Sequence, residues 1–255
     1  MIAKTGKKST KIPLTNSTVY GIIITKPPPR LKGIGFFMKV TIEQIKNNPT
    51  VKSYIRKADE SLIALGYTEH SFPHVSKVAE TAKRILLTLG YPEREAELAE
   101  IAGYLHDIGN VINRIDHAQS GAIMAFRILD NMEADPDEIA TIITAIGNHD
   151  EATAFPVNPV AAALILADKT DVRCNRVRNS ALSSFDIHDR VNYSVKRSEV
   201  RIEEGNIILD LGIDTDFCPV MDYFEIFLDR MILCRKAAEK LNLHFALIIN
   251  DQKMI

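Results

Sequence analysis

Apolar residues recur every three or four positions along residues 41–172, which is the spacing of one buried face of an α-helix. Glycines follow several of these runs and prolines open others, as expected at helix ends and helix starts. The expected helices lie near residues 41–48, 51–65, 72–89, 92–108, 113–133, 136–149 and 157–172, with Gly66, Gly90 and Gly109 at ends and Pro92 and Pro136 at starts. Neither a glycine-rich phosphate loop nor an alternating strand pattern interrupts these runs. The sequence therefore predicts a mainly α fold, a helical bundle over residues 38–180.

The period of the pattern changes after Arg178. Alternating apolar positions predict short strands, with Gly205-Asn206 as a tight turn between two of them. These positions are Val191, Tyr193 and Val195, then Val200 and Ile202, and then Leu209, Leu211 and Ile213. A long helix is expected from Pro219 to about Leu241, and a last strand from Phe245 to Ile249. We expect residues 185–255 to form a small α/β subdomain of antiparallel strands and one long helix, packed on the bundle and able to form a homodimer surface.

The first 37 residues differ from the rest of the chain. They contain seven basic residues, no acidic residue and the block Pro27-Pro-Pro29, around one short apolar run. Such a segment cannot close a core by itself. We expect residues 1–37 to be a basic, poorly ordered leader, with a basic binding arm as the alternative, and the domain to start at Met38.

Composition narrows the class of protein. The chain has 255 residues, of which 46% are hydrophobic and 25% charged, as in an ordinary globular protein. Because the net charge is −2 and the leader carries seven positive charges, the remaining residues carry −9. An acidic body argues against broad nucleic-acid binding. The scattered Cys174, Cys218 and Cys234 indicate reduced thiols in a cytoplasmic protein, and no apolar run is long enough to span a membrane.

Polar residues interrupt the apolar faces of four expected helices. His106 and Asp107 follow the apolar stripe that ends at Leu105, and His74, His149 and Asp168 each continue the stripe of another helix. A buried carboxylate is costly unless it is paired or binds a cation. A single such residue is more often a core polar group with its hydrogen bonds satisfied, but a set from four helices predicts a shared metal site.

The order His74, His106-Asp107, Asp168 resembles the HD-domain superfamily of metal-dependent phosphohydrolases. The local sequences Leu105-His-Asp-Ile-Gly109 and Ala167-Asp-Lys-Thr-Asp171 carry the resemblance, which covers about residues 70–178. His117 and His149 look like the two extra histidines of branches that bind two metals, among them the bacterial diadenosine tetraphosphatase-like and cyclic-dinucleotide phosphodiesterase groups. The Gly-Tyr-Pro motif of the second group is missing, and Asn110 stands where that group usually has Lys.

The resemblance and the residue types together predict the site. The expected metal ligands are His74, His106, Asp107, His117, His149 and Asp168. Mixed nitrogen and oxygen ligands suit Fe, Mn, Co, Ni or Zn, and six of them suggest two ions bridged by Asp107. Asp107, Asp150 and Lys169 are the expected catalytic residues, and Lys169, Arg173, Arg114 and Asn110 the expected substrate-binding residues. His70, His188 and His244 lack such a context and are not included.

The function predicted from these residues is metal-dependent hydrolysis of a phosphate ester or anhydride in a nucleotide-like small molecule. Two alternatives stay open. The same six ligands resemble those of HD-type di-iron oxygenases, and a non-catalytic metal or nucleotide sensor would need the same binding residues. The substrate, the native metal, the number of ions and the oligomeric state are not determined by the sequence.

Overall fold

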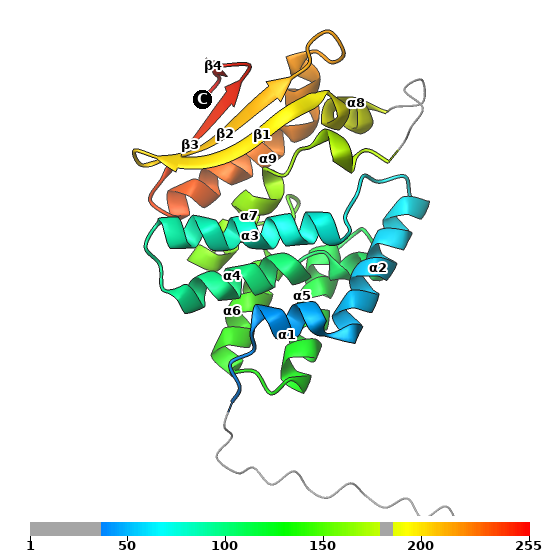
Figure 1. Ribbon diagram of the computed structural model, residues 1–255, viewed down its shortest axis with the longest axis vertical. Helices are drawn as coiled ribbons and strands as arrows, with labels where there is room; N and C mark the ends of the chain where they lie inside the picture. The colour runs from blue at the N-terminus through cyan, green and yellow to red at the C-terminus, as the bar shows by residue number, and fades with distance from the viewer. Residues whose placement is uncertain (1–36, 179–185) are drawn as a thin grey trace, which may run out of the picture. The chain divides into compact units, whose positions relative to one another are not determined.

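The computed structural model describes residues 37–178 and 186–255, and residues 37–255 form one compact unit (Figure 1). The leader expected over residues 1–37 lies outside the described residues, apart from Phe37. The first part of the chain forms α1 (Ile42–Asn47), α2 (Pro49–Ala64), α3 (Phe72–Thr88), α4 (Glu93–Leu105), the 3-10 turn η1 (Ile108–Val111), α5 (His117–Asn131), α6 (Pro136–Gly147), α7 (Pro159–Lys169) and the 3-10 turn η2 (Cys174–Arg176). The predicted mainly α class is confirmed. No helix within the described ranges is long and apolar enough to cross a membrane.

Local sequence explains where these helices start. In α2, α6 and α7 an Asn or Asp N-cap stands directly before a proline in the first turn, and the N-cap side chain accepts hydrogen bonds from backbone N–H groups. Thr41 caps α1 in a capping box with Gln44. At the other end of two helices, Gly66 and Gly90 adopt positive φ angles of 81° and 78°, the left-handed conformation that favours glycine.

The C-terminal part contains α8 (Ile187–Ser194), β1 (Val195–Glu203), β2 (Asn206–Ile213), α9 (Val220–Lys240), β3 (His244–Ile249) and β4 (Gln252–Lys253). The sheet order is β1-β2-β3-β4. The expectation of a purely antiparallel sheet was wrong, because β2 and β3 pair in parallel. The helix α9 connects them as a crossover, which parallel neighbours require. Figure 1 shows α9 between the sheet and the bundle.

The strand expected around Val191, Tyr193 and Val195 was also wrong for its first two residues. They lie in α8, and only Val195 lies in β1. Asp186 caps this helix by accepting a hydrogen bond from the N–H of Asp189 at 2.8 Å. The N-cap at Asp186 therefore favours a helix over residues 187–194, although their short alternating pattern predicted a strand.

One connected cluster of buried apolar residues runs through both parts of the chain. It extends from Val40 in the segment before α1 to Ile249 in β3, and α9 contributes Tyr223 and Phe227 to it. The bundle and the C-terminal part thus share a core, and α9 is packed where it can contribute side chains to a site in the bundle.

Gly109 has a role that differs from the expected one. It was predicted to end a helix, but α4 already ends at Leu105 and Gly109 lies within η1. A Cβ on Gly109 would stand 2.0 Å from the carbonyl oxygen of His117 and 2.5 Å from the backbone nitrogen of Gly121. The absence of a side chain therefore lets η1 pack directly against α5.

We predict that Gly109→Ala lowers the free energy of unfolding by about 3 kcal/mol or more, because η1 and α5 must separate to make room. Gly147→Ala is a matched control. Its Cβ would meet only Ala122 at 3.7 Å, so it should be neutral or stabilise by up to about 1 kcal/mol. Denaturant unfolding measures both, and equal stabilities of the two variants would contradict the close packing.

Candidate metal centre

The six expected metal ligands come together from five helices and the turns that follow them. Five of them are at most 4% exposed, and the Asp168 side chain is 12% exposed. His74 lies in the first turn of α3, His106 caps the end of α4, Asp107 precedes η1, His117 starts α5, His149 follows α6 and Asp168 lies in the last turn of α7. The apolar faces of these helices converge on the core, so the polar side chains at their ends meet in its centre.

The histidine rings all present the same nitrogen to the centre. In each ring, Nδ1 is bound by an oxygen that can only accept: Asp171 Oδ2 at 2.8 Å for His74, and the carbonyl oxygen three residues earlier in the chain for the others. These distances are 2.8 Å for His106, 3.0 Å for His117 and 2.6 Å for His149. Because Nδ1 must donate the proton, the neutral ring keeps its lone pair on Nε2.

A first set of ligand atoms surrounds the Nε2 atoms of His74 and His106. Asp107 Oδ2 lies 3.6 Å from His74 Nε2 and 3.3 Å from His106 Nε2, and Asp168 Oδ1 lies 3.4 and 3.7 Å from the same two atoms. Ligand atoms bonded to one tetrahedral ion at about 2.0–2.2 Å are separated by roughly 3.3–3.6 Å. The observed separations match that spacing.

A second set lies on the other side of Asp107. His117 Nε2 is 3.5 Å from Asp107 Oδ1, 3.2 Å from His149 Nε2 and 3.3 Å from the Arg114 guanidinium. Two Nε2 lone pairs at 3.2 Å repel each other unless a cation attracts both. Asp107 Oδ2 belongs to the first set and Oδ1 faces His117, and ligand atoms of His106, Asp107 and His149 also lie within 4.8 Å of one another, so Asp107 borders both sets.

The donor set fits a metal on an observation independent of any resemblance. His74 Nε2 and Asp107 Oδ2 are fully buried and have no hydrogen-bond partner among the described residues. Leaving a buried acceptor without a partner costs about 1–3 kcal/mol. Two such atoms in one cluster, at ligand spacing, are explained by a shared cation.

The charge states of His149 and Asp107 suit metal binding. Burial lowers the pKa of His149 well below its ordinary value. Burial raises the pKa of Asp107 and the neighbouring His106, whose Nε2 lies 3.3 Å from Oδ2, lowers it; the pKa of this carboxyl lies well below its ordinary value. An ionised carboxylate and a neutral imidazole are the forms that bind metals.

Asp171 contacts the candidate site, although no role was expected for it from the sequence. Its Oδ2 accepts the hydrogen bond from His74, and its carboxylate pairs with Arg173 Nε at 2.6 Å. A carboxylate behind a ligand histidine fixes the ring and its tautomer. The signal in the sequence was its position, three residues after Asp168.

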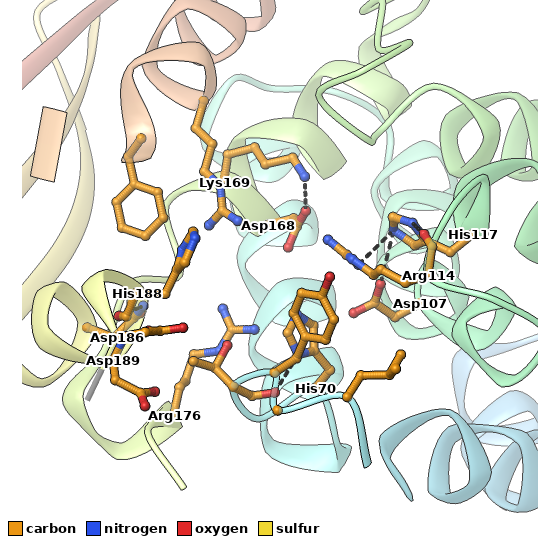
Figure 2. A pocket seen from close by; sticks show the side chains of 17 residues that line it. His70, Asp107, Arg114, His117, Asp168, Lys169, Arg176, Asp186, His188 and Asp189 are labelled. Atoms are coloured by element: carbon orange, nitrogen blue, oxygen red, sulfur yellow. Dashed lines mark hydrogen bonds and ion pairs between the residues drawn. The ribbon is translucent and has the colours of Figure 1, made fainter. Parts of the chain in front are cut away.

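A cavity of about 470 Å³ opens onto the two ligand sets. Its lining includes Asp107, His117 and Asp168, four cationic side chains, and several residues of α8 and α9. The cations are Arg114, Lys169, Arg176 and Arg230. Figure 2 shows Asp107, His117 and Arg114 on one side, with Asp186, His188 and Asp189 on the opposite side. The volume is that of an ordinary small-molecule site.

The expected catalytic and substrate-binding residues divide into two groups. Lys169 and Arg114 line the cavity, and Lys169 Nζ lies 2.8 Å from Asp168 Oδ2. Asn110, Asp150 and Arg173 are not part of its lining. Asn110 donates to Asp107 Oδ1 at 2.9 Å, and Asp150 Oδ1 lies 3.9 Å from His117 Nε2. The guanidinium of Arg173 forms a two-point pair with Asp171.

Several cavity residues were not found by sequence reasoning. His70 and His188, which were left aside, line the cavity, whereas His244 lies in β3 and is exposed. Arg176 is 5% exposed and donates to the carbonyl oxygens of Asp171 and Glu69. Neither residue type nor spacing marks these side chains, because they reach the cavity only through tertiary packing.

The comparisons with known proteins relate one region of the chain to a known domain family. Residues 72–173, which contain all six ligand candidates, match the family model of the HD domain. An uncharacterised protein of Methanocaldococcus jannaschii is 26% identical over 191 residues, covering 66% of this chain and 73% of that protein. The crystal structure of a predicted HD superfamily hydrolase from an uncultured Thermotogales bacterium matches with a TM-score of 0.38 and 25% identity, over 49% of this chain and 67% of that chain.

We predict two divalent ions per chain, because Asp107 faces two ligand sets. His117→Ala and His149→Ala should each reduce the metal content by about one ion per chain while the fold persists. His244→Ala, which removes an exposed imidazole, is the matched control and should retain full content. Mass spectrometry of the native protein and elemental analysis measure the content. One ion in the wild type, unchanged in both variants, would contradict the two-ion site.

Proposed function

We propose that the HD-domain region of this chain catalyses the metal-dependent hydrolysis of a phosphate ester or anhydride in a nucleotide-like small molecule. Four inward-facing Nε2 lone pairs around the shared Asp107 are the observation that carries the proposal. His74, His106, Asp107 and Asp168 would hold one ion, and Asp107, His117 and His149 a second. Divalent ions in this arrangement would supply activation of a water and neutralisation of phosphoryl charge.

The cationic lining of the cavity supports an anionic substrate. Arg114, Lys169, Arg176 and Arg230 all contribute to it, and Arg and Lys are the side chains that bind phosphate oxygens. Arg114 is close to the second ligand set, since its Nη1 lies 3.3 Å from His117 Nε2.

The remaining roles follow from position. Asp171 orients the His74 ring, and Asn110 holds Oδ1 of Asp107 by a hydrogen bond of 2.9 Å. Asp150 is the proposed proton acceptor, because its Oδ1 lies 3.9 Å from His117 Nε2 at the side of the second set. Arg173, which the sequence suggested as a substrate ligand, is proposed to support Asp171 instead.

We predict that Asp107→Ala lowers hydrolysis by several orders of magnitude, because it removes the carboxylate common to both ligand sets. The fold should persist, since α4 still buries Leu98, Ile101 and Leu105. Release of phosphate from a panel of phosphorylated metabolites, with Mn, Co, Ni, Fe or Mg added, measures the effect. Asp130→Ala, a change at an exposed position of α5, is the control and should keep full activity.

Two outcomes would contradict the proposal. One is wild-type activity in a folded Asp107→Ala variant. The other is a metal-loaded wild type that cleaves nothing on the panel but consumes dioxygen in the presence of a reductant, which would favour the di-iron oxygenase.

A further inference from the structure

Glu151 lies behind two of the four cations of the cavity. Its Oε2 is 3.0 Å from Lys169 Nζ in α7, and its Oε1 is 2.6 Å from Arg230 Nε in α9. The Glu151 side chain is 21% exposed, that of Lys169 5% and that of Arg230 27%. One carboxylate from the segment after α6 therefore connects a cation of the bundle with a cation of the C-terminal helix.

Both cations retain donors for a ligand. An ammonium group has three N–H donors, and Lys169 directs two of them at carboxylates, Asp168 and Glu151. A guanidinium has five donors, and the contact of Arg230 with Glu151 is not aligned as a hydrogen bond. Among the described residues, no contact occupies the two Nη groups of Arg230. Since Lys169 and Arg230 line the cavity, these donors are available to a molecule inside it.

A structural ion pair elsewhere in the chain behaves differently. The Nε and Nη2 groups of Arg94 donate hydrogen bonds to Glu138. Its Nη1 group donates to Glu97 and to the carbonyl oxygen of Val40. Each nitrogen of that guanidinium thus has a partner within the protein, and Arg94 lines neither the cavity at the metal centre nor a second cavity between α3 and β1. An ion pair that connects helices thus uses its N–H donors within the protein, whereas the Nη groups of Arg230 have no such partner among the described residues.

Two cations on one wall repel each other, so holding them there without a ligand requires a counter-charge. We propose that Glu151 is a positioning residue that holds Lys169 and Arg230 as a two-cation clamp for a phosphate group of the substrate. The inference rests on the proposed function for the substrate class. It also gives α9 a part in substrate binding, because Arg230 reaches the cavity from that helix.

The test compares binding of inorganic pyrophosphate to the purified, metal-containing protein and its variants by calorimetry. Glu151→Gln removes the charge at constant shape, and Glu151→Asp keeps the charge but is too short to reach both cations. If Glu151 positions the clamp, both variants should bind pyrophosphate roughly 10-fold more weakly or worse, the effect of losing a charge-assisted hydrogen bond. With a cleaved substrate, KM should rise more than kcat falls.

Glu138→Gln is the matched control, since it makes the same substitution in the partly buried pair with Arg94 and should leave pyrophosphate binding unchanged. A second variant, Arg230→Gln, guards against misfolding of the Glu151 variants. In its background Glu151→Gln should weaken binding by less than it does in the wild type, because half of the clamp is already lost. Thermal melting and metal content are measured for every variant.

Three results would overturn the clamp. Equal or tighter binding by Glu151→Gln would mean that the carboxylate only screens charge. A loss of metal in Glu151→Gln would mean that Glu151 acts through Asp168. A wild type that does not bind pyrophosphate would show that the two cations do not bind a phosphate group. The proposed function fails separately. If the wild type binds pyrophosphate and the variants weaken this binding as expected, but no phosphate compound is cleaved, the clamp proposal stands and the hydrolase proposal fails.

Discussion

The hydrogen bonds on the four Nδ1 atoms are the constraint on which the rest of the site depends. Each ring donates to Asp171 or to a carbonyl oxygen three residues earlier, so Nε2 remains an acceptor and faces the centre. A rotated ring would place an N–H there and repel a cation. Carbonyl groups at helix ends and turns lack helical partners, which explains why His106 and His149 stand at or just beyond such ends. The same positions place the rings in the centre of a bundle that is otherwise apolar.

The bundle could be predicted because each of its helices buries one apolar face, a property visible in the sequence at the helical period. Five of the six candidate metal ligands could be singled out because a His or Asp at such a face breaks a strong local pattern, whereas His117 was suggested only by the resemblance. Glu151 and Arg230 break no pattern, and their contact joins positions 79 residues apart. The parallel pairing of β2 with β3 was missed for a related reason, since strand patterns do not state their partners.

The two arginines after Asp168 show why proximity in sequence is a weak guide to a site. The helix α7 ends at Lys169, and Arg173 has an extended backbone with φ −149° and ψ 142°. In an extended segment, side chains two positions apart point to the same side, so the side chain of Arg173 lies beside that of Asp171 and donates a hydrogen bond to it. The turn η2 then redirects the chain and brings Arg176 to the cavity. Predicting helical continuation past Lys169 placed the wrong arginine at the substrate.

The position of Arg230 in α9 has a consequence for how the protein matures. All six candidate metal ligands lie between residues 74 and 168, whereas α9 begins at Val220. Roughly fifty residues separate the last candidate ligand from α9, so α9 leaves the ribosome several seconds after the ligand set at the usual rate of elongation. The six candidate ligands are therefore outside the ribosome before Arg230 completes the lining of the cavity.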